Sequence, residues 1–219
     1  MKDYLFFDLD GVILDSMPYH AKAWIEAFSQ FGLKFEEKEI YLHEGAIELD
    51  TARDMFLKKG VKPTPDFFEK IFKIQKSIFK SKYAKLVKPF PEVPDLLKNL
   101  KKEKKKIALV TSSHSEIFNE VFPKELLPYF SLIITGDKIE KRKPNPDPYL
   151  RALETFKIKN KEALVVENSP AGVMSAKNAK LFCIGITTTL SEQHLSLADL
   201  IVKNHKELQE ILLNGKKEQ

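Results

Sequence analysis

The stretch Tyr4-Leu5-Phe6-Phe7-Asp8-Leu9-Asp10-Gly11 joins an apolar run to two aspartates and a glycine. The apolar run predicts a buried strand, and a buried strand does not ordinarily end in unpartnered carboxylates, because desolvating a charge is costly. The glycine permits a sharp turn directly after the acids. One carboxylate of such a pair can attack an electrophile and the other can move a proton. Both can share a divalent cation that offsets their repulsion.

Two simpler interpretations of these acids exist. An Asp-Gly pair is common in tight turns, and Asp-x-Asp can open a calcium-binding loop. A turn explains Asp10 and Gly11 but not Asp8, and the apolar residues at 12–14 supply none of the oxygen ligands that a calcium loop needs. The motif alone favours catalysis only moderately, so the rest of the chain has to separate these interpretations.

The composition is that of an ordinary globular protein of 219 residues, with 43% hydrophobic residues. A formal net charge of +5 and a basic tract at residues 101–106 raise the possibility of nucleic-acid binding. Arginine occurs only at positions 53, 142 and 151, and no aromatic residue interrupts the tract. Bidentate base contacts and stacking platforms are therefore scarce, and a solvated basic helix end explains the tract better. We expect no nucleic-acid partner.

Membrane association and secretion are not expected either. The N-terminal apolar run is interrupted by Asp8, Asp10 and Asp15, and no apolar run approaches the length of a membrane span. Cys183 is the single cysteine, which excludes an intramolecular disulfide, and its apolar neighbours predict a buried, unreactive thiol. We expect a cytoplasmic protein, monomeric and without a membrane partner.

Six short apolar runs predict the strands of a parallel sheet, because strands covered on both faces lack polar alternation. They lie at residues 4–7, 107–111, 132–135, 163–166, 182–186 and 200–202. Between them, apolar residues recur at helical spacing, as at Val93, Leu96, Leu97 and Leu100. The alternation indicates right-handed crossovers and an α/β fold with a three-layer core around a parallel sheet.

Residues 17–87 are the exception, because no convincing strand is found there. Ala21, Trp24, Ile25 and Phe28 fall at helical spacing, and Gly32 is expected to end that helix. Two further helical patterns run over about 50–59 and 65–83. A block of helices therefore interrupts the alternation after the first strand.

Polar residues follow four of the predicted strands. The four groups are Asp8 and Asp10, Thr111-Ser112-Ser113, residues 141–148, and Glu167-Asn168-Ser169-Pro170. Taken singly, the second group could be a helix N-cap and the fourth an ordinary helix start. Ligands of parallel sheets bind at the carboxyl ends of the strands, so all four groups together predict one site.

In order and spacing, these groups resemble the four motifs of the haloacid dehalogenase superfamily of phosphotransferases, whose first motif is an apolar run followed by Asp-x-Asp-Gly. The match covers essentially the whole chain. Asp15, His20, Ala23 and Trp24 extend it toward the branch of β-phosphoglucomutases and small-sugar phosphatases. The resemblance implies a Rossmann-like core of residues 1–16 and 88–219 and an α-helical cap of residues 17–87 over the active site.

The same resemblance implies a role for each motif in phosphoryl transfer. Asp8 would be the nucleophile that forms an aspartyl phosphate, and Asp10 the general acid and then the general base. Thr111 would donate its hydroxyl to a phosphate oxygen. Lys143 would place a cation against both the phosphate and Asp8.

Mg²⁺ is the cofactor that the resemblance implies, held by Asp8, Asp10, Glu167 and Asn168. Many relatives carry an acid at the position of Asn168. An amide oxygen is an acceptable Mg²⁺ ligand, but the lost negative charge should weaken metal binding. We therefore expect Glu167 to carry more of the metal-binding role in this chain.

The substrate is expected to contact five further residues, namely Ser112, Ser113, His20, Lys76 and Asn145. His20 and Lys76 match positions in β-phosphoglucomutases, although His20 at helical spacing is equally compatible with an ordinary helix-face residue. Residues 42–48 lack the arginine with which the mutases hold the far phosphate of a bisphosphate, and Glu48 near that position would repel it. This favours hydrolysis over isomerisation.

The sequence thus predicts a Mg²⁺-dependent phosphatase that acts on a small phosphorylated metabolite, such as a sugar phosphate or phosphoglycolate. Two alternatives stay open. One is a mutase similar to β-phosphoglucomutase. The other is a non-catalytic protein that binds a phosphorylated metabolite, with Asn168 as the mark of its weakened metal site.

Overall fold

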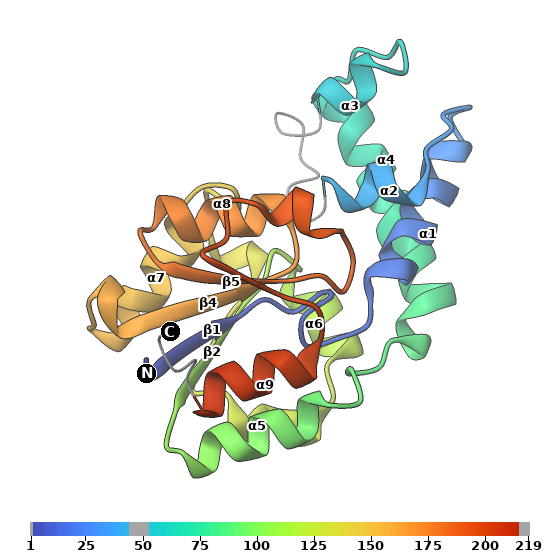
Figure 1. The fold of residues 1–219 in the computed structure, drawn as a ribbon. Helices are drawn as coiled ribbons and strands as arrows, with labels where there is room; N and C mark the ends of the chain where they lie inside the picture. The colour runs from blue at the N-terminus through green and yellow to red at the C-terminus, as the bar shows by residue number, and fades with distance from the viewer. Residues whose placement is uncertain (1, 44–52, 215–219) are drawn as a thin grey trace.

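A computed structural model describes residues 2–43 and 53–214 of the chain. Its centre is a parallel sheet of six strands in the order β3-β2-β1-β4-β5-β6 (Figure 1). The strands are β1 Tyr4–Phe7, β2 Lys106–Val110, β3 Leu132–Ile134, β4 Ala163–Glu167, β5 Phe182–Ile186 and β6 Leu200–Val202. All six predicted strands are present, with bounds that differ by at most one residue at either end. The parallel α/β fold is confirmed.

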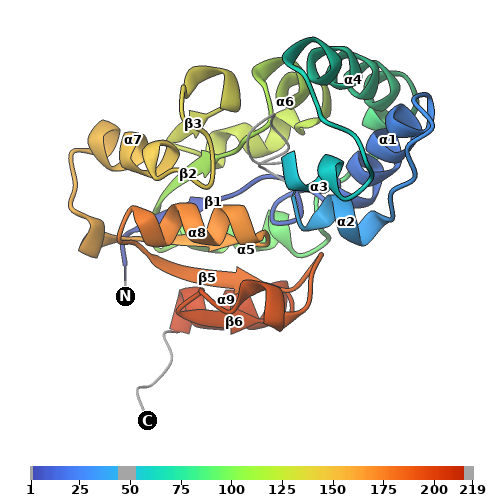
Figure 2. The ribbon, with the colours of Figure 1, turned by 90° about the horizontal axis from the view of Figure 1, so that it is seen from above.

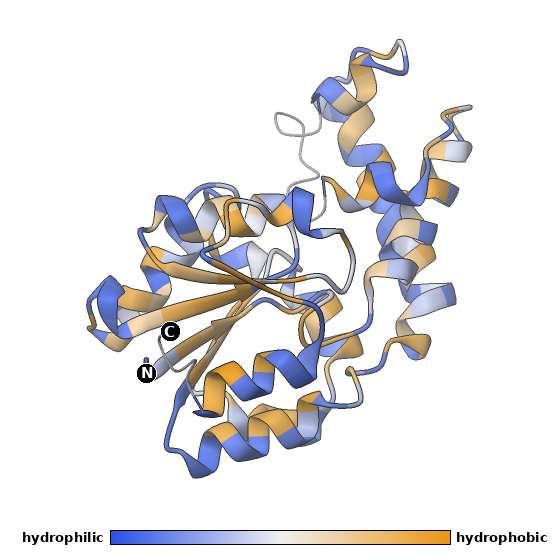
Figure 3. Ribbon diagram, viewed as in Figure 1, coloured by the Kyte–Doolittle hydropathy of each residue, from blue (hydrophilic) through white to orange (hydrophobic). Residues whose placement is uncertain are grey.

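Helices cover both faces of the sheet and give the three layers. The helices α5 Val93–Lys102, α6 Ser115–Val121 and α9 His205–Asn214 pack on one face, and α7 Asp147–Phe156 and α8 Pro170–Asn178 on the other. Within β1, Leu5 and Phe7 belong to the first apolar cluster and Phe6 to the second. Figure 3 shows the strands apolar along their length, as expected of strands buried on both sides.

The helical block has an apolar cluster of its own. It contains α1 Met17–Ser29, α2 Glu37–Tyr41, α3 Arg53–Leu57 and α4 Pro65–Ile78, followed by a π-helical segment at Phe79–Tyr83. Trp24 and Phe28 of α1 meet Phe56 of α3 and Ile71 of α4 in this cluster. Figure 2 shows these helices side by side at one end of the sheet. The bounds of the cap at residues 17 and 87 stay a prediction.

Local sequence explains where these elements begin and end. The chain turns after α1 at Gly32, whose φ of +71° is readily adopted only by glycine. Thr64 caps α4 by accepting a hydrogen bond from the backbone N–H of Phe67, and Pro65 occupies the first turn. The helix predicted over residues 65–83 is present along its whole length, as α4 followed by the π-helical segment at Phe79–Tyr83.

The strand order positions the functional residues. β1 pairs with β2 on one side and with β4 on the other, so the direction in which strands are added reverses at β1. At such a switch point, the loops that follow the two strands run to opposite sides of the sheet. A crevice therefore opens between them at the carboxyl ends of the strands. Asp8 follows β1 and Glu167 is the last residue of β4. No helix in residues 2–43 and 53–214 is long and apolar enough to cross a membrane.

The apolar cluster of the helical block predicts a stability effect. Phe28 is fully buried and its ring contacts those of Trp24, Phe35 and Phe56. We expect Phe28→Ala to lower the free energy of unfolding by about 3–5 kcal/mol, the usual cost of deleting a buried aromatic ring. Chemical denaturation would measure the loss. Leu57→Ala, in which an apolar side chain is removed from a 47% exposed position, is the control and should change stability little. A loss below about 1 kcal/mol for Phe28→Ala would contradict a packed cluster.

Candidate active site

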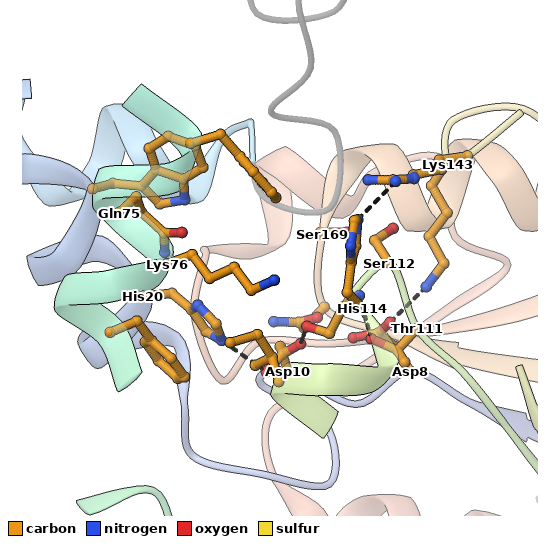
Figure 4. A pocket seen from close by; sticks show the side chains of 17 residues that line it. Asp8, Asp10, His20, Gln75, Lys76, Thr111, Ser112, His114, Lys143 and Ser169 are labelled. Carbon is orange, nitrogen blue, oxygen red and sulfur yellow. Dashed lines mark hydrogen bonds and ion pairs between the residues drawn. The ribbon is translucent and has the colours of Figure 1, made fainter. Parts of the chain in front are cut away.

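The four polar groups meet in one cavity between the carboxyl edge of the sheet and the helices of the predicted cap (Figure 4). From α6 and the segments that follow the strands come Asp8, Asp10, Thr111, Ser112, Ser113, His114, Ile117, Arg142, Lys143, Asn168 and Ser169. From α1, α4 and the π-helical segment come His20, Trp24, Phe72, Gln75, Lys76 and Phe79. The structure therefore brings together residues that lie more than 150 positions apart in the sequence.

Lys143 lies at the centre of a buried charge cluster. Its ammonium donates to Asp8 Oδ1 at 2.5 Å, to Glu167 Oε1 at 2.6 Å and to the carbonyl of Val110 at 2.9 Å. The lysine side chain is 2% exposed. Burial alone would lower the pKa of Lys143, but the charges of Asp8 and Glu167 outweigh it and raise that pKa. Lys143 is therefore a permanent cation that links β1, β2 and β4.

The surroundings of Asp8 disfavour the ionised form of its carboxyl group. Burial raises the pKa of its carboxyl to about 8, against the lowering effect of Lys143, and the negative charges of Glu167 and Asp10 add to the rise. The Lys143 ammonium contacts two carboxylates, those of Asp8 and Glu167, so one negative charge of this buried group is not offset by the lysine. A divalent cation near Asp8 would remove this imbalance.

Glu167 is fully buried, does not line the cavity, and accepts a hydrogen bond from Lys143. Its Oε1 also accepts a hydrogen bond from the Tyr149 hydroxyl at 2.8 Å, and its Oε2 accepts from the backbone N–H of Asn168 at 3.1 Å. Gly172 makes room for this carboxylate, because a Cβ there would lie 1.9 Å from Oε1. The larger metal-binding role that we expected of Glu167 stays a prediction. The oxygens of Glu167 are engaged by protein groups in this arrangement.

Asp10 is fixed from three sides as an ionised carboxylate. Ser16 and Ser113 donate to its two oxygens at 2.6 and 2.7 Å, and His20 Nε2 lies 3.2 Å from Oδ1. Burial would raise the pKa of Asp10, but the charge and hydrogen bond of His20 and the two serine hydroxyls lower it to about 2. The ring of His20 is stacked on Phe79 at 4.1 Å between centroids. His20 thus does more than occupy a helix face.

The segment after β2 brings hydroxyl and N–H groups to the same edge. Thr111 is buried, and its Oγ1 accepts a hydrogen bond from the backbone N–H of Ser113 at 2.9 Å. Gly136, after β3, lets the chain pass close by, since a Cβ there would lie 2.1 Å from the carbonyl oxygen of Ser112. Close packing between the β2 and β3 loops therefore fixes where these donors stand.

The donor set of the cavity fits a hard divalent cation. Within residues 2–43 and 53–214, no three His, Cys, Asp or Glu side chains are grouped to hold a metal ion. What the cavity offers instead is the Asp8 and Asp10 pair plus the amide of Asn168. Asn168 donates its Nδ2 to Thr189 Oγ1 at 2.9 Å, and it packs against Gly11, where a Cβ would lie 2.0 Å from Nδ2. Thr189 thereby engages the nitrogen of the amide, and the amide oxygen is of the ligand type that suits Mg²⁺.

Two predicted contacts are not brought to the acids. Asn145 is exposed and does not line the cavity; its side chain donates to the carbonyl of Arg142 at 2.9 Å. Lys76 does line the cavity, but its ammonium forms an ion pair with Glu116 of α6. Glu48 lies outside the described residues.

Sequence reasoning missed several residues of the site. Tyr149, Arg142, His114 and Thr189 were not singled out, although Arg142 directly precedes Lys143. The signal for Thr189 was present: residues 187–189 are three threonines that follow β5, which is the same pattern of polar residues at a strand end that identified the other groups. The sequence pattern did not indicate Tyr149 or His114. Their partners, Glu167 and Arg142, are brought to them only by the fold.

Comparison with known proteins agrees with this geometry. Residues 5–186 match the family described as haloacid dehalogenase-like hydrolases. The chain is similar to a phosphorylated carbohydrates phosphatase of Thermotoga maritima, with 27% identity over 86% of this chain and 87% of that protein. It is also similar to a phosphoglycolate phosphatase of Neisseria meningitidis, with 28% identity over 94% and 92% of the two chains. A solved structure of a proposed β-phosphoglucomutase from Bacteroides vulgatus is 28% identical and superposes with a TM-score of 0.82, covering 99% and 91% of the two chains.

The contacts of Asp10 predict a measurable titration. His20→Phe keeps the ring that stacks on Phe79 but removes the charge and the hydrogen bond, so the pKa of Asp10 should rise from about 2 toward or above its ordinary value. Carbon-detected NMR of the carboxyl group in the metal-free protein would follow this titration. His43→Phe, in which another histidine of the helical block is replaced, should leave it unchanged. An unaltered pKa in His20→Phe would show that the serines alone hold Asp10 ionised.

Proposed function

Because the chain belongs to the haloacid dehalogenase-like hydrolase family, we propose that it is a Mg²⁺-dependent phosphatase that works through an aspartyl phosphate. Its substrate is a small phosphorylated metabolite, such as a sugar phosphate or phosphoglycolate. The observation that carries this proposal is the pair of carboxylates in two different states. Asp8 contacts a buried lysine, and Asp10 is held ionised by His20 and two serines.

Asp8 is suited to attack phosphorus. Lys143 holds Oδ1 of its carboxylate at 2.5 Å, and Asp8 lines the cavity, so we assign the attack to its other oxygen. In the proposed first step this oxygen forms a bond to phosphorus while the bond from phosphorus to the alcohol oxygen breaks. The departing oxygen takes a proton from Asp10, which must therefore bind a proton when substrate is present. Positioning and charge stabilisation supply most of the catalysis in such transfers.

Asp10 is suited to the second step in its resting, ionised form. It removes a proton from a water molecule, whose oxygen then attacks the phosphorus of the aspartyl phosphate. The bond between phosphorus and the Asp8 oxygen breaks, and phosphate leaves. Asp10 regains the proton that the next cycle requires, so one carboxylate serves both steps. The low pKa of Asp10 makes its acid form scarce in the absence of substrate, in keeping with this base role.

The remaining groups stabilise charge on the transferred phosphoryl group. Thr111 and the N–H groups of the segment after β2 would donate to its oxygens, and Lys143 would offset its negative charge. Asp8, Asp10 and Asn168 would hold Mg²⁺, which would supply further positive charge for the transferred phosphoryl group. The raised pKa of Asp8 supports this assignment, because the site disfavours that negative charge until a cation is added.

Hydrolysis and isomerisation differ in their product. The likeness to the Bacteroides vulgatus protein keeps a mutase as the second candidate, while the two curated relatives carry phosphatase names. Incubation with β-glucose 1-phosphate and Mg²⁺ separates the two. Release of inorganic phosphate supports the phosphatase, and glucose 6-phosphate would support the mutase. Binding of phosphorylated metabolites without either product would support the non-catalytic alternative.

Asp8→Asn should abolish turnover and leave the fold intact, because an amide does not attack phosphorus. It should also raise the stability of the metal-free protein at neutral pH. The pKa of Asp8 is higher in the folded state, about 8, than its ordinary 3.8, so the wild type loses stability as pH rises between these values. The gain of the variant should therefore be greatest above pH 8 and disappear below the ordinary pKa.

Phosphate release and thermal unfolding at several pH values would check both parts. Asp95→Asn, on helix α5 and away from the cavity, serves as a matched control. Substantial residual turnover in Asp8→Asn would remove Asp8 from the nucleophilic role. A stability gain that is the same at acid and alkaline pH would contradict the argument from its raised pKa.

Asn168→Asp tests the metal site. If the Asn168 oxygen binds Mg²⁺, a carboxylate there adds charge attraction and should lower the Mg²⁺ concentration for half-maximal activity. Turnover at saturating metal need not rise, because tighter metal binding in the ground state does not stabilise the transition state. Asn119→Asp, on the exposed side of α6, makes the same chemical change away from the site. An unchanged metal requirement in Asn168→Asp would place Asn168 outside the metal shell.

A further inference from the structure

Two polar groups on the helical wall of the cavity take no part in the steps above. Gln75 of α4 and Trp24 of α1 line the cavity and are only 6% and 4% exposed. Among the residues that the structure describes, none forms a hydrogen bond with the side-chain amide of Gln75 or with the indole N–H of Trp24. A buried amide that lacks a partner is costly, so this wall indicates a ligand that carries matching polar groups. Figure 4 shows Gln75 on the side of the cavity opposite Asp8.

Helical spacing places both groups one turn beyond the residue that contacts Asp10. His20 Nε2 lies 3.2 Å from Asp10 Oδ1, and the His20 ring stacks on Phe79. Trp24 follows His20 by one turn of α1. Gln75 precedes Phe79 by one turn, since the backbone N–H of Phe79 donates to the Gln75 carbonyl. Four residues of α-helix advance about 6 Å, so the amide and the indole stand about that far beyond the pair formed by His20 and Phe79.

The surroundings of these groups suit a neutral hydrogen-bonding partner. Phe72 lies three residues before Gln75 on α4, and its ring contacts that of Trp24 at 6.0 Å between centroids. Lys76 also lines the cavity, but its ammonium forms an ion pair with Glu116. An amide and an indole carry no charge that could offset a desolvated anion. An amide both donates and accepts hydrogen bonds, and so does a hydroxyl group.

We propose that Gln75 is a specificity-determining residue that binds a hydroxyl group of the departing alcohol, about one helical turn from the oxygen that Asp10 protonates. This inference rests on the proposed function, which places the phosphate at Asp8 and the leaving oxygen at Asp10. The indole N–H of Trp24 donates to the same hydroxyl. The inference separates the substrates named above, because the two-carbon leaving group of phosphoglycolate carries no further hydroxyl and spans less than one helical turn.

Binding of non-hydrolysable phosphonates tests the contact without relying on turnover. Calorimetry with Mg²⁺ present compares ω-hydroxyalkylphosphonates, with chains of two to six carbons, with alkylphosphonates in which a methyl group replaces the hydroxyl. At one chain length the wild type should bind the hydroxyl compound about fivefold to a hundredfold more tightly than its methyl counterpart, because only the hydroxyl gives the buried amide a partner. A wall without a polar contact would favour the methyl compound at every length.

Substitutions of Gln75 locate the contact. Gln75→Met keeps the length of the side chain and removes its amide, so the hydroxyl preference should disappear. Gln30→Met makes the same change at the exposed end of α1 and should retain the preference. Gln75→Asn withdraws the amide by one methylene group, so the preferred chain should become longer.

Three results would count against this role. A purely structural Gln75 would change the binding of both series alike and leave the preferred chain length in place. An undiminished hydroxyl preference in Gln75→Met, or tighter binding of the methyl compound by the wild type at every length, would overturn the inference.

Thermal unfolding without ligand tests the premise that the amide has no partner within the protein. Gln75→Met should not lower the melting temperature, because it breaks no hydrogen bond. A clear loss of stability in Gln75→Met, with none in Gln30→Met, would show that the amide supports the helical block and would overturn the inference.

Phosphate release from the corresponding hydroxyalkyl phosphates keeps this inference separate from the proposed function. A hydroxyl preference that depends on Gln75, without release of phosphate from any phosphomonoester, would leave the Gln75 contact standing and remove the phosphatase. Phosphate release without a hydroxyl preference would do the reverse.

Discussion

The buried ammonium of Lys143 is the interaction on which the other features of the site depend. It contacts the carboxylates of Asp8 and Glu167 and the last carbonyl of β2, so it joins three neighbouring strands through one charge. Buried ions are costly unless they are paired and hydrogen-bonded, and Lys143 is the cation shared by two buried carboxylates. The Tyr149 hydroxyl and the glycine at position 172 complete this arrangement by holding Glu167 in place.

The same cluster leaves a surplus of negative charge, and that surplus has a chemical use. The raised pKa of Asp8 reflects a carboxylate whose surroundings favour added positive charge. Asp10 is two residues away, yet it is held ionised by His20 and two hydroxyls. Two acids in contrasting surroundings are how one site separates a nucleophile from a proton carrier. The strand order places both at the switch point next to β1.

Much of the fold could be read from the sequence because strands buried on both faces leave continuous apolar runs. All six strands were predicted in this way, and the polar groups at four strand ends located the cavity. Asp8, Asp10, Thr111 and Lys143 do lie together there. The bounds of the cap, the metal ligands and the catalytic roles stay predictions.

The residues that sequence reasoning missed share one property. Arg142 and His114 are 28 positions apart, and they meet because β2 and β3 are neighbours in the sheet. Tyr149 lies on α7 and reaches Glu167 at the end of β4. Glu167 faces Lys143 because Gly172 leaves space on that side. Asn145, two residues after Lys143, was expected at the substrate, but it is exposed and its side chain donates to the carbonyl of Arg142. Contacts between elements depend on packing, which periodicity and motif spacing do not encode.

The central claim is that Asp8 carries the phosphoryl group during turnover, and direct trapping of that group tests it. Asp10→Asn should still accept a phosphoryl group from acetyl phosphate, whose leaving group needs no proton, but it should lose it slowly because no base activates water. Intact-mass measurement followed by peptide mapping, with Mg²⁺ present, would locate the group. The account predicts one phosphoryl group per chain, on Asp8. A phosphoryl group on another residue, or none at any time during turnover, would contradict it.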